Sequence, residues 1–359
     1  MSPLPTTVVV PTVGRPSLHR LLRVLSGATP QPAEILVVDD RPGHGSADGS
    51  ADGSAPLDVP PGVRVLRSGG RGPAAARNVG WRASRTPWVS FLDDDVEPDA
   101  GWLADLGHDL GTVDDDVAGS QGRVRVPLPR HRRPTDDERG TAGLEHAAWI
   151  TADMTYRRSA LAAVDGFDER FHRAYREDAD IALRIIARGG RIVRGGRRIV
   201  HPVRPSGFFS SVRSQAGNAD DMLMRRLHGP GWRDRAQAGR GRKGRHAAIT
   251  AAGGLAVALA AAGRRRAALA AALAWGASTA EFAATRIGPG PRTAAEVIRM
   301  VVTSVLIPPA ATWHTARGWL RYRHLVPWSS DRRPAREVAG PGPVRATGMA
   351  RASAGTRQL

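Results

Sequence analysis

The apolar run Trp88–Leu92 is followed at once by three carboxylates, Asp93, Asp94 and Asp95. A dense apolar run of this length is typical of a buried strand, and open α/β sheets bind ligands beyond the carboxyl ends of their strands. Because adjacent carboxylates repel one another unless a cation is present, the triplet favours a Mg²⁺ or Mn²⁺ site over a solvated acidic turn. Asp93 and Asp95 are the expected ligands, since alternate residues of an extended segment share a face.

Apolar runs and helical patterns alternate through the first half of the chain. Strands are expected at Thr7–Pro11, Glu34–Asp40, Val63–Leu66 and Val117–Val126, and helices at Pro16–Leu25, Pro73–Trp81, Gly101–Leu110 and Glu177–Arg188. Two short strands are expected at Ile192–Val193 and Ile199–Pro202, and polar loops at Arg41–Gly62 and Pro127–Gly140. Strands that alternate with helices predict a doubly wound α/β fold with a mostly parallel sheet.

A change in composition divides the chain into four regions. Residues 1–224 are the expected catalytic domain, with a nucleotide-sugar half at 1–98 and an acceptor half at 99–224. An Arg/Gly-rich linker is expected at 225–245, an Ala-rich helical and apolar extension at 246–328, and a disordered basic tail at 329–359. Within the extension, the proline pair Pro308-Pro309 is expected to break an apolar stretch at 297–313.

Charge and composition restrict the class of partner. The formal net charge of +18 favours anionic partners such as nucleotide phosphates or acidic lipid headgroups. Aromatic residues make up only 5% of the chain, which argues against a stacking platform for single strands, and we expect no nucleic-acid partner. The absence of cysteine excludes disulfides, thiolate catalysis and cysteine-based zinc sites, and it fits a reducing cytosol.

Six segments between about residues 6 and 205 resemble family 2 inverting glycosyltransferases of the GT-A fold, and they occur in the family's order. The segments are Val8–Thr12, Leu36–Asp40, Gly72–Gly80, Phe91–Asp95, Gly166–Glu169 and Arg176–Arg184. The resemblance implies a metal-dependent enzyme that transfers one sugar from a nucleotide-sugar to a hydroxyl acceptor. The family's processive synthases often carry a Gln-x-x-Arg-Trp motif, and Gln215–Ala219 lacks its Arg-Trp pair, so single transfer is expected.

The resemblance also implies roles for the donor-side residues. Asp95 would bind the metal, Asp93 the metal or the ribose, and His201 would be a third metal ligand; the middle carboxylate, Asp94, is the least certain. Asp40 would bind uracil or ribose, and Arg77 would lie near the base and phosphates. Asp39 also follows the second strand, where a carboxylate can accept a bond from a ribose hydroxyl or a base N–H. Pro11, Thr12 and Arg15, at the end of the first strand, would contact the nucleoside. Some of these roles have a structural alternative. Asp39 and Asp40 could cap a loop, Arg77 could be a solvated arginine on a helix, and His201 could be a structural histidine.

Glu177 and Asp178 begin a helix and are the expected catalytic pair. Acids are favourable in any first helical turn, which is the alternative interpretation. The resemblance favours Asp178 as the base that deprotonates the acceptor hydroxyl, so that a single displacement inverts the anomeric centre. Trp149 and Asp153 are expected to shape the acceptor pocket.

The apolar stretches at 246–263 and 267–284 are somewhat short for a full span of about 20 residues. If both crossed, Arg264–Arg266 would lie on the far side, against the positive-inside tendency. We therefore expect amphipathic or re-entrant helices on the cytoplasmic leaflet, where a lipid-linked or cell-envelope acceptor would fit; a soluble helical extension is the alternative. Met1–Pro5 shows no signal-peptide pattern, so a cytoplasmic location, peripheral or anchored at the inner membrane face, is expected.

Two other functions remain open on the sequence alone. A sugar nucleotidyltransferase also uses paired acids on a doubly wound sheet, but it would typically carry a basic, Gly-rich loop after the first strand. A non-enzymatic adaptor that binds nucleic acid or a membrane surface through the arginine-rich half would leave the ordered carboxylates unexplained.

Overall fold

The computed structural model describes residues 3–42 and 55–330. Its centre is an eight-stranded sheet with the order β3-β2-β1-β4-β7-β6-β8-β5. The strands are β1 (Leu4–Thr12), β2 (Pro32–Asp39), β3 (Val63–Arg67), β4 (Trp88–Leu92), β5 (Glu97–Pro98), β6 (Val117–Arg125), β7 (Asp153–Arg157) and β8 (Arg191–Val200). Strands β1 to β4 are parallel, β6 and β8 are parallel to each other, and β7 runs antiparallel to both β4 and β6. The predicted doubly wound, mostly parallel α/β sheet is confirmed.

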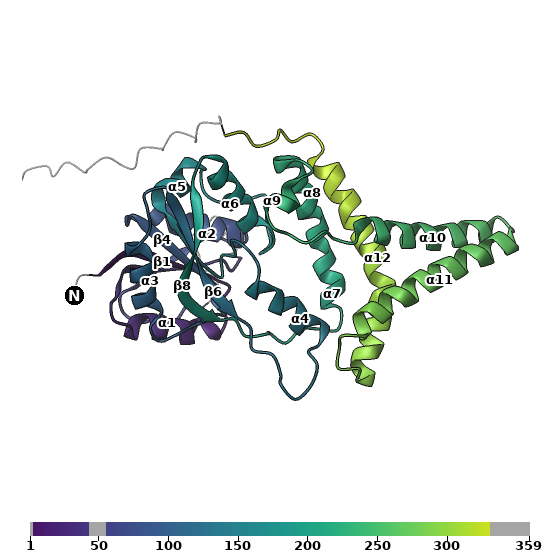
Figure 1. Ribbon diagram of the computed structural model, residues 1–359, viewed down its shortest axis with the longest axis horizontal. Coiled ribbons are helices and arrows are strands. Elements are labelled where there is room, and N and C mark those ends of the chain that lie inside the picture. Colours follow the sequence, from purple (N-terminus) through teal and green to yellow (C-terminus); the bar gives the residue numbers. More distant parts are fainter. Residues whose placement is uncertain (1–2, 43–54, 331–359) are drawn as a thin grey trace, which may run out of the picture.

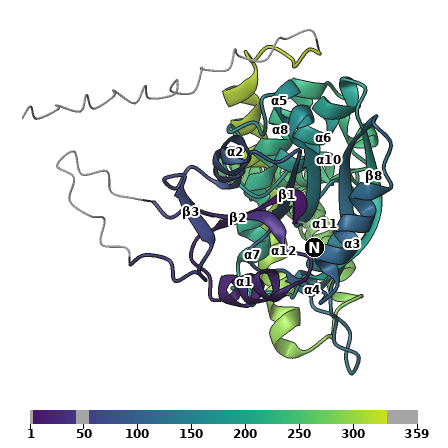
Figure 2. The same ribbon diagram turned by 90° about the vertical axis from the view of Figure 1, so that its left-hand side faces the viewer.

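Helices cover both faces of the sheet because alternate strand residues point to opposite sides. Val8 and Val10 of β1 pack toward α1 (Ser17–Gly27) and α3 (Trp102–Gly111). Val9 packs on the other side, toward α2 (Pro73–Ala83), α5 (Arg158–Ala163) and α6 (Glu177–Ala187). Figure 2 shows α1 and α2 on opposite sides of β1 to β3. Burial on both faces explains the near-continuous apolar runs of these strands.

β8 is one continuous strand where the sequence predicted two short ones. The glycine pair in its middle, Gly195-Gly196, permits a close approach to Asp109 of α3. A Cβ on Gly195 would lie 2.1 Å from Asp109 Oδ2, and Gly196 N donates to Asp109 Oδ1 at 2.7 Å. The strand continues past the glycines, and its pairing with β6 shifts register there.

The segment 225–245 is not an unstructured linker. It contains the end of α8 (Gly217–His228), the short α9 (Trp232–Arg235) and the start of α10 (Lys243–Ala261). Trp232 is buried and packs with Leu223 and Met224 of α8, which fastens the segment to the expected catalytic domain. The linker was expected from the high glycine and arginine content of the segment, which gives no information on the burial of Trp232.

The C-terminal extension consists of α10, α11 (Arg265–Ile287) and α12 (Ala294–Tyr322). Figure 1 shows α10 and α11 as a hairpin that extends away from the sheet, with α12 between the hairpin and α8. The expected break at Pro308-Pro309 is wrong, because α12 runs through both prolines. Buried residues on both sides of the pair, Met300 and Ala311 among them, hold the helix in place despite the lost backbone donors. The predicted tail beyond residue 330 lies outside the described residues.

Candidate active site

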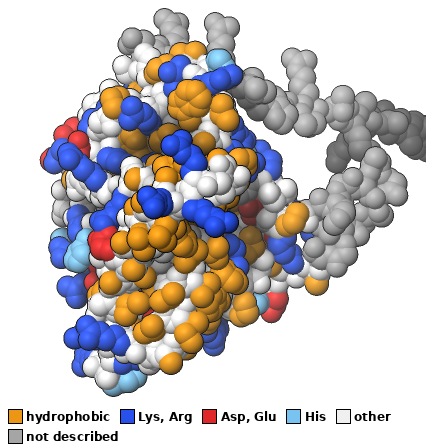
Figure 3. Space-filling model, turned by 90° about the vertical axis from the view of Figure 1, so that its right-hand side faces the viewer, with side chains coloured by type: hydrophobic (Ala, Val, Ile, Leu, Met, Phe, Trp, Pro, Cys, Tyr) orange, Lys and Arg blue, Asp and Glu red, His pale blue; other side chains and the backbone are white. Residues whose placement is uncertain are grey.

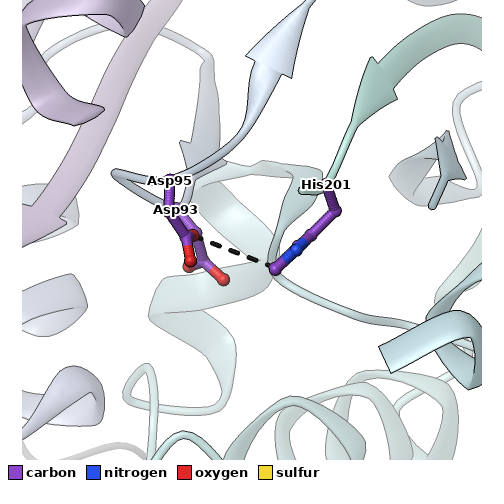
Figure 4. Close-up of side chains that lie close together, drawn as sticks. All are labelled: Asp93, Asp95 and His201. Atoms are coloured by element: carbon purple, nitrogen blue, oxygen red, sulfur yellow. Dashed lines mark ion pairs between the residues drawn. The ribbon is translucent and has the colours of Figure 1, made fainter. Parts of the chain in front are cut away.

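Asp93, Asp95 and His201, the metal ligands expected from the sequence, lie close together and could hold a metal ion. One ligand atom from each lies within 4.8 Å of the others, at the ends of β4 and β8 (Figure 4). His201 Nδ1 lies 3.3 Å from the carbonyl oxygen of Pro202, and since a carbonyl only accepts, this contact places the proton on Nδ1. The Nε2 lone pair is then available on the side of the two carboxylates. Two carboxylates and an imidazole suit Mn²⁺ or Mg²⁺.

Arg204 is a member of this cluster that the sequence reasoning missed. Its Nε lies 2.8 Å from Asp95 Oδ2, while His201 Nε2 lies 3.9 Å from Asp95 Oδ1. Arg204 is half exposed, so it partly compensates the charge of a buried carboxylate. Residues 201–207 form no helix or strand, so no sequence periodicity could have pointed to Arg204.

Arg77 joins the metal cluster to the expected catalytic pair. Its guanidinium is almost completely buried, donating from Nη2 to Asp93 Oδ1 and from Nη1 to Glu177 Oε1, both at 2.9 Å. Although burial works against it, the charges of Asp93 and Glu177 raise the pKa of Arg77, so it stays cationic. The solvated-arginine alternative is therefore wrong, and Arg77 fixes the distance between the two acidic groups.

Asp178 is the freer of the two acids at the start of α6. Glu177 is buried against Arg77, whereas Asp178 is only partly buried and accepts one bond, from Ala179 N at 2.7 Å. Burial, together with the charge of Asp178, raises the pKa of Glu177. Burial also raises the pKa of Asp178, and the charge of Asp93 adds to that shift. A carboxylate with a raised pKa is a better proton acceptor.

The backbone just before this pair is in an unusual conformation. Arg176 has φ of 78°, in the left-handed region that a non-glycine residue rarely adopts. Its Nε donates to Asp221 Oδ1 at 3.0 Å, and its guanidinium lies over the rings of Tyr175 and Trp232. These contacts hold the turn that presents Glu177 and Asp178 to the cavity. Local strain of this kind concentrates at functional sites.

Asp94, the middle carboxylate, points away from the metal cluster toward β1. It accepts from Thr12 Oγ1 at 2.6 Å and from Arg15 Nη1 at 2.5 Å. Thr12 and Arg15, expected to contact a nucleoside, thus have Asp94 as their partner here. Pro11 lies beside them near the end of β1, opposite Val38. Asp94 therefore holds Thr12 and Arg15 together at the carboxyl end of β1.

Asp39 and Asp40, at the end of β2, each have partners. Hydrogen bonds and charge from Arg41 lower the pKa of Asp39 despite its burial. Asp40 accepts from Ser68 Oγ at 2.7 Å and from Gly72 N at 2.9 Å. Asp40 therefore connects the end of β2 to the turn before α2.

One cavity of about 520 Å³ is lined by residues of both the candidate metal cluster and the expected catalytic pair. Its lining includes Asp93 and His201 on one side and Glu177 and Asp178 on another. The remaining wall comes from α4 (Asp136–Ala142), α7 (Ser210–Arg213) and the segment before β7, with Asp136, Asp137, Thr141, Ile150, Thr151, Ala152, Ser206 and Ser210 exposed to it. The helix α4 lies in part of the segment that was expected to be a loop.

Trp149 and Asp153 are not among the residues that line this cavity, so the structure does not place them in an acceptor pocket. Asp153 is fully buried behind the wall, where it accepts from Trp102 Nε1 at 2.8 Å and from Arg197 Nε at 2.7 Å. Trp149 packs against the hydrophobic core. The residues between them, Ile150–Ala152, face the cavity instead. The sequence located the right segment but not the side chains within it.

Comparison with known proteins gives a family for the first half of the chain. Residues 7–182 match glycosyl transferase family 2. Pre-mycofactocin glycosyltransferases from two strains of Mycobacterium tuberculosis are each 34% identical over 206 residues, covering 52% of this chain and 40% of the relatives. The matched part thus spans well under half the length of these curated relatives.

Solved structures with a similar fold include two sugar transferases. The mannosyltransferase PcManGT from Pyrobaculum calidifontis, in complex with GDP-Man and Mn²⁺, is 21% identical with a TM-score of 0.47, covering 85% of this chain and 88% of that one. Glucosyl-3-phosphoglycerate synthase from Mycobacterium tuberculosis, with Mn²⁺, UDP-glucose and phosphoglyceric acid, is 15% identical with a TM-score of 0.41, covering 66% and 80%.

Proposed function

Since the chain belongs, through residues 7–182, to glycosyl transferase family 2, we propose that it transfers one sugar from a nucleoside diphosphate sugar to a hydroxyl acceptor with inversion. The observation that carries the proposal is the single cavity that contains Asp93 and His201 of the metal cluster and also Asp178. A nucleotidyltransferase has no need for a second acidic pair across such a cavity.

The donor side of the mechanism rests on Asp93, Asp95 and His201. A divalent metal held there would neutralise the negative charge of the diphosphate leaving group. Arg77 keeps Asp93 in place and supplies a fixed positive charge behind it. Asp40 and Arg15 lie at the ends of β2 and β1, where a nucleoside would bind in this fold.

The acceptor side rests on Asp178. The acceptor hydroxyl gives its proton to the Asp178 carboxylate as its oxygen attacks the anomeric carbon from the face opposite the diphosphate. The new carbon–oxygen bond forms while the bond to the phosphate oxygen breaks, and that electron pair leaves with the nucleoside diphosphate. Asp178 is preferred over Glu177 because Arg77 already occupies the Glu177 carboxylate.

The variant Asp178→Asn tests this assignment. We expect it to bind nucleotide normally but to lose transfer by a factor of about 10² or more, the usual contribution of a positioned base. In the wild type, protonation of Asp178 should lower kcat as the pH falls. Because the pKa of Asp178 is raised, this loss should begin at a higher pH than an ordinary carboxyl group would give. Asp105→Asn, an exposed change on α3, is the matched control. Normal turnover by Asp178→Asn would rule out Asp178 as the base.

We also propose that the C-terminal extension contacts a membrane, which fits a lipid-linked acceptor. The helices α11 and α12 are long and apolar enough to cross a bilayer, judged by length and composition only. Large apolar side chains such as Val257, Leu269 and Trp313 are exposed on the extension, and Figure 3 shows hydrophobic side chains gathered on this face with arginines around them. The apolar residues of α10 and α11 are not confined to one side, so the expected amphipathic character is wrong for these two helices.

A further inference from the structure

A second cavity, of about 600 Å³, lies where the N-terminal end of α6 faces α8, α9 and the start of α10. Five cationic side chains line it, and Asp221 is the one carboxylate among its lining residues. The cations are Arg173, Arg176, Arg233, Arg242 and Lys243. Nothing in the proposed sugar transfer requires this concentration of positive charge.

Asp221 cannot balance these charges. It is almost fully buried and already accepts from Arg176 Nε at 3.0 Å, from Lys243 Nζ at 2.8 Å, and from Arg233. In the described part of the chain, neither Arg173 nor Arg242 forms a close ion pair. The charge of Asp220 acts on Arg173 at longer range, and Arg242 donates to Thr285 Oγ1 at 3.2 Å. The cavity therefore has an excess of positive charge that an anion would neutralise.

The pKa of Lys243 is lowered mainly by burial, and two neighbouring arginines contribute. These are Arg233 and Arg176, and Asp221 opposes the shift that they and burial cause. An anion bound beside Lys243 would reverse this repulsion and stabilise the ammonium form.

The start of α10 adds backbone donors to the cavity wall. Lys243 is the first residue of this 19-residue helix, whose first turn has no side-chain cap and no acidic residue. The positive end of a helix in this state favours an anion. His246, one turn further along, also lines the cavity; it is more than nine-tenths buried, and its Nδ1 has no hydrogen-bond partner among the described residues.

We propose that this cavity binds a phosphate-bearing ligand through a phosphomonoester or diphosphate group. The cavity shares Ala174 and Ser214 with the wall of the catalytic cavity, and it lies at the root of the α10–α11 hairpin. A single acceptor can thus place its phosphate here and its hydroxyl beside Asp178, a step that rests on the proposed function. The phosphate can belong to a lipid headgroup or to a soluble molecule.

The test is calorimetric titration of inorganic pyrophosphate into the full chain in EDTA, where metal-dependent binding at Asp93 is absent. We compare the wild type with the double variant R173Q/R242Q, which removes two exposed charges without breaking an ion pair of Asp221. R23Q/R85Q, two exposed arginines elsewhere, is matched in charge. We expect at least about tenfold weaker binding for R173Q/R242Q and unchanged binding for R23Q/R85Q.

Equal pyrophosphate affinity in all three proteins, or no binding by the wild type, would overturn the proposal. Flotation with phosphatidylcholine vesicles containing phosphatidic acid separates the two sources of phosphate. Weaker flotation of R173Q/R242Q than of R23Q/R85Q assigns the site to a lipid headgroup, and equal flotation with weakened pyrophosphate binding assigns it to a soluble phosphate. Mn²⁺-dependent nucleotide binding, measured on the same samples, reports separately whether the proposed transferase function fails.

Discussion

Arg197 shows how a single residue supports the site from behind. Its side chain is fully buried and donates to Asp153 Oδ1 at 2.7 Å, Asp109 Oδ2 at 3.0 Å and the carbonyl oxygen of Ser120 at 2.6 Å, joining three elements of the acceptor half. Arg197→Met would leave two buried carboxylates unpaired, so we expect a loss of about 3–5 kcal/mol in unfolding free energy by urea denaturation. The exposed neighbour variant Arg198→Met should change it little. Equal stability of the two variants would contradict this account of the buried cluster.

At the scale of elements, the α10–α11 hairpin is the part of the fold whose role is least explained by packing. Leu269 and Leu273 of α11 are 62% and 64% exposed, so substituting glutamate there should not disturb the core. We expect L269E/L273E to lose about tenfold or more in binding to phosphatidylglycerol vesicles, because two large apolar side chains would no longer enter the lipid. The control V65E/L128E makes the same charge change on exposed residues of the catalytic domain. Similar flotation of both variants would remove the hairpin from the membrane contact.

At the scale of the whole molecule, the extension is fastened to the wall of the catalytic cavity. Arg286 of α11 donates from Nη2 to Asp136 Oδ2 at 2.7 Å, and Arg299 of α12 pairs with Asp137 at 2.5 Å. Both aspartates belong to α4 and line the cavity. We expect Arg286→Met to raise the KM for the acceptor several-fold with an unchanged nucleotide Kd, since α4 loses a charge-assisted bond on the acceptor side only. Arg266→Met, exposed on the same helix, should change neither constant, and a shift in nucleotide Kd alone would contradict this coupling.

The part of the site that could be predicted from the sequence is the part set by the geometry of parallel strands. The carboxyl ends of strands meet at one edge, so carboxylates and a histidine placed there were expected to gather, and Asp93, Asp95 and His201 do. Pairings between residues far apart in the sequence could not be predicted in this way. Asp94 pairs with Arg15, 79 residues away, and Asp153 pairs with Arg197, 44 residues away. Because the partner of Asp153 could not be foreseen, this carboxylate was expected in the acceptor pocket but lies in the core.

The most direct test of the central claim is calorimetric titration of UDP, dTDP and GDP into the full chain, with Mn²⁺ and again with EDTA. The account predicts that one nucleotide binds in Mn²⁺, that EDTA abolishes the binding, and that Asp95→Ala abolishes it too. The exposed change Asp105→Asn should leave the affinity unchanged. Failure of all three nucleotides to bind under either condition, or unchanged affinity in Asp95→Ala, would contradict a metal-dependent donor site at this edge of the sheet.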